Sequence, residues 1–175
     1  MAQTSKWGIW LKNATKNLLF SVPVVVVFLD NVGYVAKVEG ISMQPALNPE
    51  EDKTNDYVLL NKWVMRKFEV KPGDIVALTC PRDPDQKLIK RVIALEGDTV
   101  KAANKLRYVS VPVGHCWIEG ENLKHSMDSN FFGPVAVGLI IAKASHIVWP
   151  PSRWQKLESR LPSDRGPLKW PKADF

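Results

Sequence analysis

Hydrophobic residues first gather in one short run, "LLFSVPVVVVFL", which begins at Leu18 and ends at Leu29. These twelve residues are fewer than the roughly 20 that a bilayer-spanning helix needs. Few charges lie nearby, so a helix from about residue 12 to 32 would reach across if its lysines extended to the interface and its proline were tolerated. We therefore predict that residues 1–34 comprise a basic segment and a transmembrane anchor.

A cleaved signal peptide is the alternative explanation of the same run. The residues that follow, "DNVGYVAKV", contain no clear pair of small residues at the spacing of a cleavage site. A retained anchor is therefore the favoured interpretation. Because basic residues precede the run, we expect the rest of the chain to lie across the membrane from the N-terminus.

From Val35 onward the pattern changes to short apolar runs separated by turn residues. Runs bounded by Gly, Pro, Asp and Asn are typical of antiparallel strands. We predict a mainly β domain over residues 35–150, folded as an antiparallel sandwich or barrel-like assembly. The predicted strands are "YVLLNKW" from Tyr57, "DIVALT" from Asp74, "KLIKRVIAL" from Lys87, "RYVSV" from Arg107, "CWIEG" from Cys116 and "HIVW" from His146.

The last segment, residues 151–175, combines a helical pattern with a polar tail. "PPSRWQKLESRL" places Trp154, Leu157 and Leu161 on one side of an amphipathic helix that a serine would cap. The tail from Pro162 is rich in proline and charge, so we expect it to be flexible. We predict a short C-terminal helix followed by a loose tail.

Composition narrows the classes of partner. The chain has 175 residues, of which 45% are hydrophobic, and a formal net charge of +6. This hydrophobic content supports a packed core. A basic balance often indicates nucleic-acid binding, but the Lys and Arg residues are scattered and form no recognised nucleic-acid motif. We therefore predict no nucleic-acid partner, and the basic excess also suits a protein close to a membrane.

Cysteine and histidine spacing gives no sign of a metal site. Cys80 and Cys116 are too few for a disulfide scaffold, which leaves one disulfide or, as we favour, two free thiols. The three histidines are dispersed and match no metal-binding motif. We predict neither a metal nor another cofactor.

The stretch "VEGISMQP" contains one serine, Ser42, with no Asp or His close to it in sequence. A serine becomes a nucleophile when a base accepts its proton, and a His-Asp pair from elsewhere in the chain stays open. Alternation in "KLIKRVIAL" offers another base, because it places Lys90 on one face with Leu88, Val92 and Ala94. Burial would have to lower a lysine pKa by about 3 units for work near neutral pH. A lysine that extends its amine to solvent is the structural alternative.

The chain contains four motifs whose residues, order and spacing resemble those of the type I signal peptidase family. In that family a serine and a lysine form a catalytic dyad. The resemblance covers residues 38–149, and four motifs together are far more specific than one. They are the G-x-S-M-x-P motif at Gly40 to Pro45, the strand from Asp56 to Lys62, the lysine motif "KRVIALEGD" from Lys90 to Asp98, and "GENLKHSMDS" from Gly120 to Ser129.

This resemblance implies a role for each matched residue. Ser42 would be the nucleophile and Lys90 the general base, and Ser126 would hydrogen-bond to the Lys90 amine and orient it. The backbone N–H of Ser42 would stabilise the oxyanion. Some relatives have a second serine at the position of Gly40, so here we expect donation from the backbone alone. Gly40 also suits a tight turn with an unusual φ.

One departure from the family pattern changes the expected ion pairs. The family's usual arginine after Asp-Ser is Asn130 here, so Asp128 lacks its nearest partner. We hypothesise that Arg91 pairs with Asp128 instead and links the Lys90 strand to the loop after residue 120. We interpret Asp74 and Asp98, which follow glycines in turns, as structural.

The resemblance implies a membrane-anchored serine endopeptidase that removes sorting or signal sequences from precursor proteins. "FGPV" and "IVWPPSRWQKLES" are similar to a mitochondrial branch of the family. That similarity implies a single-pass protein of the inner membrane, a domain that faces the intermembrane space, and a sister catalytic subunit as heterodimer partner. An extended precursor would add to a strand edge beside Ser42, with small side chains in shallow pockets.

Two other classes of protein are the alternatives. A self-cleaving Ser-Lys repressor would need a DNA-binding domain before the dyad, where this chain has a hydrophobic segment. A catalytically inactive or binding subunit would keep the fold, but the presence of both Ser42 and Lys90 argues against it.

Overall fold

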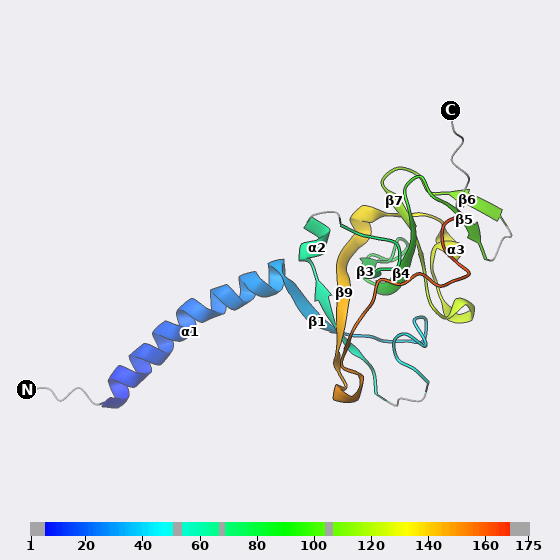
Figure 1. Ribbon diagram of the computed structural model, residues 1–175. Helices are drawn as coiled ribbons and strands as arrows, with labels where there is room; N and C mark the ends of the chain where they lie inside the picture. The colour runs from blue at the N-terminus through cyan, green and yellow to red at the C-terminus, as the bar shows by residue number, and fades with distance from the viewer. Residues whose placement is uncertain (1–5, 51–53, 67–68, 104–106, 169–175) are drawn as a thin grey trace, which may run out of the picture.

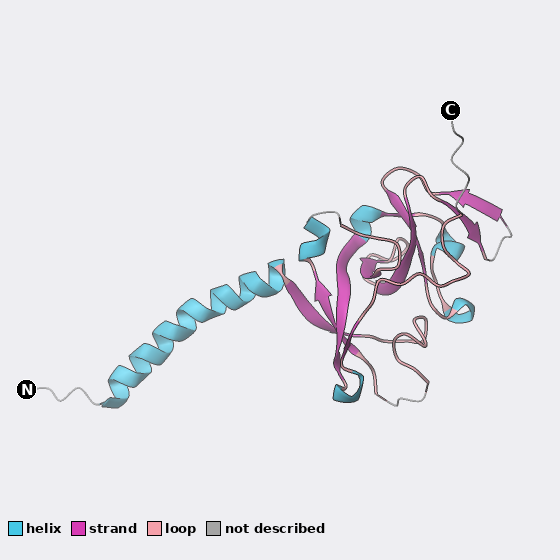
Figure 2. Ribbon diagram, viewed as in Figure 1, coloured by secondary structure: helices cyan, strands magenta, loops and turns pink. Residues whose placement is uncertain are grey.

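Antiparallel strands dominate the computed structural model, which describes residues 6–50, 54–66, 69–103 and 107–168 (Figure 1, Figure 2). The prediction of a mainly β chain is confirmed. The helices are α1 Lys6–Asn31, α2 Trp63–Arg66 and α3 Ser129–Phe132, with 3₁₀ turns η1 Leu123–His125, η2 Val137–Leu139 and η3 Pro151–Arg153. The strands are β1 Gly33–Lys37, β2 Tyr57–Asn61, β3 Ile75–Thr79, β4 Lys87–Leu95, β5 Thr99–Ala102, β6 Arg107–Ser110, β7 His115–Glu119, β8 Val135–Ala136, β9 Ile140–Trp149 and β10 Gln155–Lys156.

One large sheet has the strand order β1-β2-β9-β3-β4-β7-β8, with β10 added to β9. Register shifts interrupt the pairing of β9 with β2 and β3, and that of β4 with β7. Such irregularities bend strands and increase twist, so the sheet curls. Its first and last strands, β1 and β8, do not pair with each other. The strands β5 and β6 form a separate two-stranded sheet.

Both faces of the central strands are buried. In β3, Ile75 and Ala77 belong to one hydrophobic cluster, and Val76 and Leu78 belong to another. A third cluster packs the β5–β6 sheet against Trp117 of β7. Neutral apolar side chains therefore surround the neighbouring strand β4 from both sides of the sheet.

The alternation predicted for β4 holds only as far as Val92. A register shift lies between Val92 and Ala94, opposite β7, and Ile93 and Ala94 both belong to the third cluster. The prediction that Ala94 shares a face with the earlier even-numbered residues is therefore wrong, because the bulge breaks the period of two.

The N-terminal helix that the sequence predicts is present as α1. Helix α1 projects away from the β domain (Figure 1), and it begins earlier than predicted, at Lys6. Within the described residues, no helix meets the length and hydropathy that a bilayer crossing demands. The apolar run fills only the second half of α1, after polar residues that include Lys12 and Lys16.

The predicted C-terminal amphipathic helix is wrong. After η3 the chain is extended: β10 pairs with β9, and the Leu157 N–H donates to the Ser145 carbonyl at 2.8 Å. Leu157 and Leu161, whose spacing looked helical, pack against two different hydrophobic clusters. An extended chain reaches both clusters, whereas one helical turn spans only about 5.4 Å.

The predicted loose tail is also corrected in part. The Leu168 N–H donates to the Thr99 carbonyl at 2.8 Å, so the chain is held at the β5–β6 sheet up to this residue. Residues 169–175 of the predicted tail lie outside the described residues. We refer to residues 150–168 as the C-terminal strap.

Candidate active site

Ser42 lies in a tight turn that follows β1. The turn is preceded by Gly40, whose φ of +85° is a conformation that only glycine adopts without strain. Met43 and Leu47 are fully buried in the core, and the Leu47 N–H donates to the Met43 carbonyl at 2.9 Å. These contacts fix the turn against the sheet and leave the Ser42 side chain partly exposed.

Lys90 lies in the middle of β4, where its Cα is paired with that of Val76 in β3. It is only 2% exposed. Its Nζ lies 2.7 Å from Ser42 Oγ and also donates to the Ile89 carbonyl at 3.1 Å. The structure thus brings together the two residues of the predicted dyad.

Burial lowers the pKa of Lys90 from 10.5 to about 8. The negative charge of Asp128 and the Cys80 thiol oppose this effect and raise the same pKa. The decrease is smaller than the sequence argument required, but it still brings the amine close to working pH. An amine of this kind can both accept and donate a proton.

Ser126 lies next to the dyad without bonding to it. Its Oγ is buried and has no hydrogen-bond partner among the described residues. A Cβ at Gly120 would clash with Ser126 and lie 2.5 Å from the Ser42 carbonyl oxygen, so glycine alone fits between the two serines. The hydrogen bond to Lys90 that the resemblance implied is not formed, although the Ser126 hydroxyl is placed with no competing partner in the described chain.

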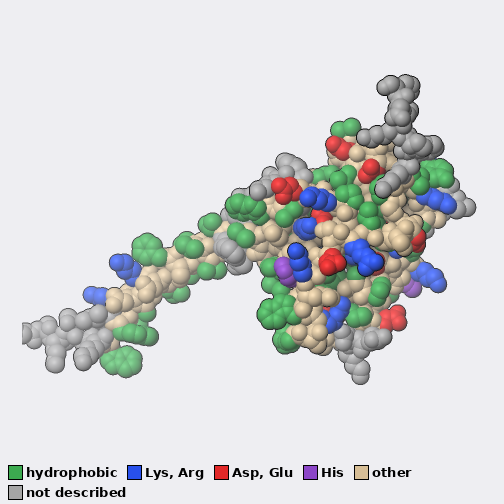
Figure 3. All heavy atoms as spheres, viewed as in Figure 1, with side chains coloured by type: hydrophobic (Ala, Val, Ile, Leu, Met, Phe, Trp, Pro, Cys, Tyr) green, Lys and Arg blue, Asp and Glu red, His purple; other side chains and the backbone are tan. Residues whose placement is uncertain are grey.

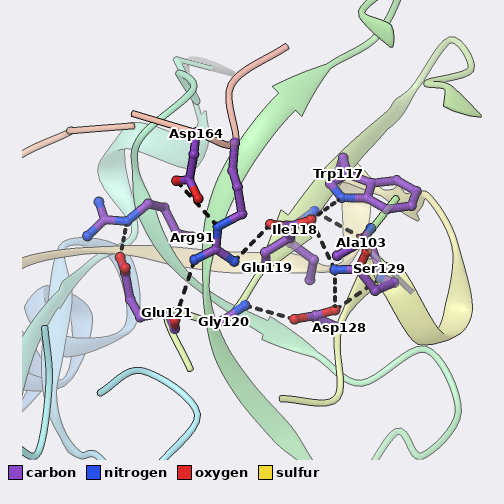
Figure 4. A network of polar contacts seen from close by, with 12 residues as sticks. Arg91, Ala103, Trp117, Ile118, Glu119, Gly120, Glu121, Asp128, Ser129 and Asp164 are labelled. Carbon is purple, nitrogen blue, oxygen red and sulfur yellow. Dashed lines mark hydrogen bonds and ion pairs between the residues drawn. The ribbon is translucent and has the colours of Figure 1, made fainter. Parts of the chain in front are cut away.

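Asp128 and Arg91 do not form the hypothesised ion pair. Asp128 instead caps α3: its carboxylate accepts the N–H of Asn130 at 3.0 Å and the N–H of Gly120 at 2.9 Å. Arg91 Nε lies 2.5 Å from Glu121 Oε1 (Figure 4). Successive strand residues point to opposite faces, so Arg91 points away from the side on which Lys90 meets the serine.

Sequence reasoning missed a buried carboxylate at the end of β7. Glu119 Oε1 accepts hydrogen bonds from Trp117 Nε1 at 2.9 Å and Asn130 Nδ2 at 3.0 Å (Figure 4). Its other oxygen lies 3.3 Å from Arg165 Nη1. Burial raises the pKa of Glu119, and its two hydrogen bonds and the Arg165 charge oppose the rise. One signal in the sequence could have pointed to Glu119: the family's usual arginine is replaced by the uncharged Asn130. The Asn130 side chain hydrogen-bonds to both Glu119 and Asp128, so the positive charge near Glu119 has to come from elsewhere.

A cavity of about 710 Å³ opens beside the dyad. Both Ser42 and Lys90 contribute to its wall. Much of the remaining wall is apolar and comes from β1, β2 and β4, with Tyr34, Ala36, Val38, Leu60, Leu88 and Ile89 among the lining residues.

Among the described residues, neither the cysteines nor His125 hydrogen-bonds to Ser42 or Lys90. Cys80 and Cys116 are both buried free thiols, and burial raises the pKa of Cys116 to about 11. His125 is exposed at the cavity wall, with its Nδ1 3.4 Å from Asn122 Oδ1. In the described ranges, no three His, Cys, Asp or Glu residues come together in a group that would hold a metal ion.

Known proteins resemble the chain over most of its length. The family model described as signal peptidase, peptidase S26, matches residues 11–110 and 103–149. The Mus musculus protein named mitochondrial inner membrane protease subunit 2 is 56% identical over 97% of this chain and 98% of its own length. The Mus musculus protein named mitochondrial inner membrane protease subunit 1 is 35% identical over 68% of this chain and 71% of its own.

A solved structure gives a weaker likeness. A signal peptidase I from Enterococcus faecalis V583 matches with a TM-score of 0.38 and 22% identity, over 43% of this chain and 97% of its own. That TM-score is too low for a shared fold to be inferred from it.

Proposed function

The chain belongs to the signal peptidase family, peptidase S26, and is a serine peptidase, and we propose that Ser42 and Lys90 carry out its reaction. The observation that carries this proposal is the 2.7 Å distance between Lys90 Nζ and Ser42 Oγ, with the lysine buried. A pKa of about 8 leaves part of the amine neutral at physiological pH.

In the proposed reaction Lys90 first accepts and then donates a proton, both when the ester on Ser42 forms and when water hydrolyses it. Neutral Lys90 accepts the Ser42 proton as Oγ attacks the scissile carbonyl carbon. The resulting ammonium donates that proton to the leaving amine as the C–N bond breaks, which leaves an ester on Ser42. Water then attacks the ester with Lys90 again as the base, and the returned proton restores the Ser42 hydroxyl as the new carboxyl end leaves.

The oxyanion of the tetrahedral intermediate needs hydrogen-bond donors. The Ser42 backbone N–H has no acceptor in the part of the chain that is described, so it is available to a substrate. Gly40 offers no side-chain hydroxyl. We therefore propose that the backbone alone stabilises the oxyanion.

Ser126 is our candidate for orienting the lysine. Its buried hydroxyl has no partner among the described residues, so it is available to accept a hydrogen bond from the Lys90 ammonium once the serine proton has moved. Asp128 and Arg91 support this arrangement indirectly, because Asp128 holds the Gly120 N–H and Arg91 holds the Glu121 side chain.

An extended precursor segment is the substrate class that the cavity favours. One wall is β1, an edge strand of the large sheet. A peptide that pairs with a sheet edge gains main-chain hydrogen bonds, and alternate side chains enter pockets on the wall. We propose that the substrates are sorting or signal sequences of proteins delivered to the mitochondrial intermembrane space. The family description, signal peptidase, and the name of the mouse relative, a mitochondrial inner membrane protease, support this proposal.

The proposed location is the mitochondrial inner membrane, with α1 as a single crossing and the catalytic domain facing the intermembrane space. The apolar residues of α1 from Leu18 to Val27 are exposed along the helix, which favours contact with lipid. The proposed partner is a sister catalytic subunit, since the mouse has both a subunit 1 and a subunit 2 that resemble this chain.

The proposal predicts that intermembrane-space precursors accumulate uncleaved when the full-length chain carries Ser42→Ala or Lys90→Ala. Gel mobility of newly imported precursors in mitochondria that contain each variant measures this directly. Immunoblots must show equal amounts of variant and wild-type chain. Normal cleavage in both variants would rule out the proposed dyad and leave the chain with a binding role.

A further inference from the structure

The C-terminal strap is tied to the β domain by polar contacts with three buried carboxylates. Arg153 Nη1 lies 2.5 Å from Asp56 Oδ2, and both residues are largely buried. The Ser159 hydroxyl donates to Asp74, which Lys143 also binds at 2.6 Å. The third carboxylate is Glu119, and its partner on the strap is Arg165.

The Arg165 contact differs from the other two because it reaches the segment that holds the nucleophile. The Arg165 guanidinium binds Glu119 through Nη1 and donates through Nη2 to the Glu121 carbonyl at 3.4 Å. Its side chain is 17% exposed and that of Glu119 is 4% exposed, so the pair is shielded from solvent. One arginine thus binds both residues that flank Gly120.

The segment from Glu119 to Asn122 in turn contacts the Ser42 main chain. The Asn122 N–H donates to the Ser42 carbonyl at 3.1 Å, and the Gly120 Cα packs against the same carbonyl oxygen. A continuous set of contacts therefore joins the Arg165 charge to the nucleophile turn. Of the residues in these contacts, Ser42 is the one that lines the cavity that would hold a substrate, and Arg165 does not line it.

We propose that Arg165 is a positioning residue for the hydrolysis. Its positive charge holds Glu119 and the Glu121 carbonyl, and through them it fixes the Ser42 carbonyl and the orientation of the Ser42 N–H. This inference rests on the proposed function of Ser42 and Lys90. Asn130 carries no positive charge near Glu119. In this proposal Arg165 supplies that charge from the strap, 46 positions further along the chain.

The physical reason is the cost of an unpaired buried charge. Removing one partner of a buried ion pair leaves the other without compensation. Without Arg165, Glu119 Oε2 would have no partner among the described residues, although Oε1 would keep its two hydrogen bonds. The carboxylate would then draw in water or move toward solvent, and the segment up to Asn122 would move with it. A displacement of about 1 Å in a reacting group can reduce a rate by up to about 100-fold.

The test uses the full-length chain, purified in detergent with the subunit that accompanies it, and the precursor that accumulates with Ser42→Ala. We expect Arg165→Gln to lower kcat about tenfold with little change in KM, because neither Arg165 nor the two residues that it binds line the cavity. Arg165→Lys keeps the charge but loses the two-nitrogen contact, so its kcat should lie between those of Arg165→Gln and wild type. Arg160→Gln is the matched control on the strap, since Arg160 is exposed, and it should leave kcat unchanged.

The double variant Glu119→Gln with Arg165→Gln separates charge balance from simple packing. A glutamine side chain in place of Glu119 still accepts hydrogen bonds but carries no charge, so kcat should return to within about threefold of wild type. A double variant as slow as Arg165→Gln would overturn the proposal, and so would a kcat for Arg165→Gln within about twofold of wild type. If Ser42→Ala were as active as wild type in this assay, the proposed dyad itself would fail, whatever Arg165 does.

Discussion

Strand β4 and helix α1 depart in opposite senses from the usual distribution of polarity. β4 contains two buried cations, Lys90 and Arg91, between apolar clusters. The second half of α1 exposes apolar side chains along a helix that projects from the β domain (Figure 3). Both arrangements cost free energy in an isolated soluble chain. The comparison locates the two activities that we propose, proton transfer at β4 and membrane attachment at α1.

Within β4 itself the two cations are treated differently. Arg91 is compensated by the Glu121 carboxylate and the Gly73 carbonyl. Lys90 forms no ion pair with a carboxylate in the described chain, and its bonds go to Ser42 Oγ and the Ile89 carbonyl. Burial therefore lowers the pKa of Lys90, and no ion-paired carboxylate in the described chain restores it fully. The first prediction tests this lysine.

The largest expected effect is that of Lys90→Arg, which keeps the positive charge in β4 but removes the base. Arginine stays protonated at any accessible pH, so the variant cannot accept the Ser42 proton. We expect cleavage of the accumulating precursor to fall by about 10²- to 10⁴-fold, the usual contribution of general-base catalysis. Lys101→Arg, an exposed change in β5, is the control. Substantial activity at about pH 9 in Lys90→Arg would contradict the assignment of the base.

The same burial predicts that Lys90→Met stabilises the fold while it abolishes activity. A pKa lowered from 10.5 to about 8 corresponds to about 3 kcal/mol at neutral pH that a neutral side chain of similar length avoids. We expect the free energy of unfolding to rise by about 2–3 kcal/mol at about pH 7. The gain should shrink as pH rises from about 8 to 10.5, because the folded lysine is then neutral and the unfolded one still charged. Denaturant unfolding at about pH 7 and about pH 10 measures both effects, and an unchanged or lower stability at neutral pH would contradict them.

The pH dependence of the wild-type rate is the next effect in size. Only neutral Lys90 accepts the serine proton, so kcat/KM should rise about tenfold per pH unit below the pKa of about 8 and level off above it. Between about pH 6 and pH 8 the increase should be about 50-fold. A profile that is flat over this range, measured with the full-length chain, would mean that an unburied or different group is the base.

The strands of the sheet and the C-terminal strap differ in how well the sequence predicts their structure. The strands β2, β3, β4 and β7 were predictable because each is a short apolar run between turn residues, and Ser42 and Lys90 stand in motifs with fixed spacing. The strands β1, β8 and β10 and the first half of β9 were not predicted. The strap was not predictable, because Leu157 and Leu161 have helical spacing although each fills a different cluster. Sheet pairing overrode local propensity there.

Ion pairs were the least predictable feature of the site. Charge and proximity in sequence suggested Arg91 with Asp128, but strand alternation and the capping of α3 direct the two side chains to other partners. Glu119 and Arg165 meet only because the strap crosses the end of β7, and no local pattern records that path. Long-range pairs of this kind depend on the whole fold.

The smallest predicted change in cleavage rate concerns α1 and tests the other half of the comparison. Introducing Val25→Lys and Val26→Lys places two charges in the exposed apolar half of the helix, each costing up to about 3 kcal/mol in hydrocarbon. We expect the chain to move from the membrane pellet to the supernatant on alkaline extraction. Cleavage of membrane-held precursors should fall about tenfold, because the site loses its high local concentration, while Ser42 and Lys90 stay intact.

Asn13→Lys, in the polar half of α1, is the matched control and should stay in the pellet. If the double variant stayed in the pellet at full activity, the exposed valines would not attach the chain to lipid. Of the two unusual arrangements, the buried Lys90 and the exposed apolar helix, the buried Lys90 alone would then contribute to the reaction.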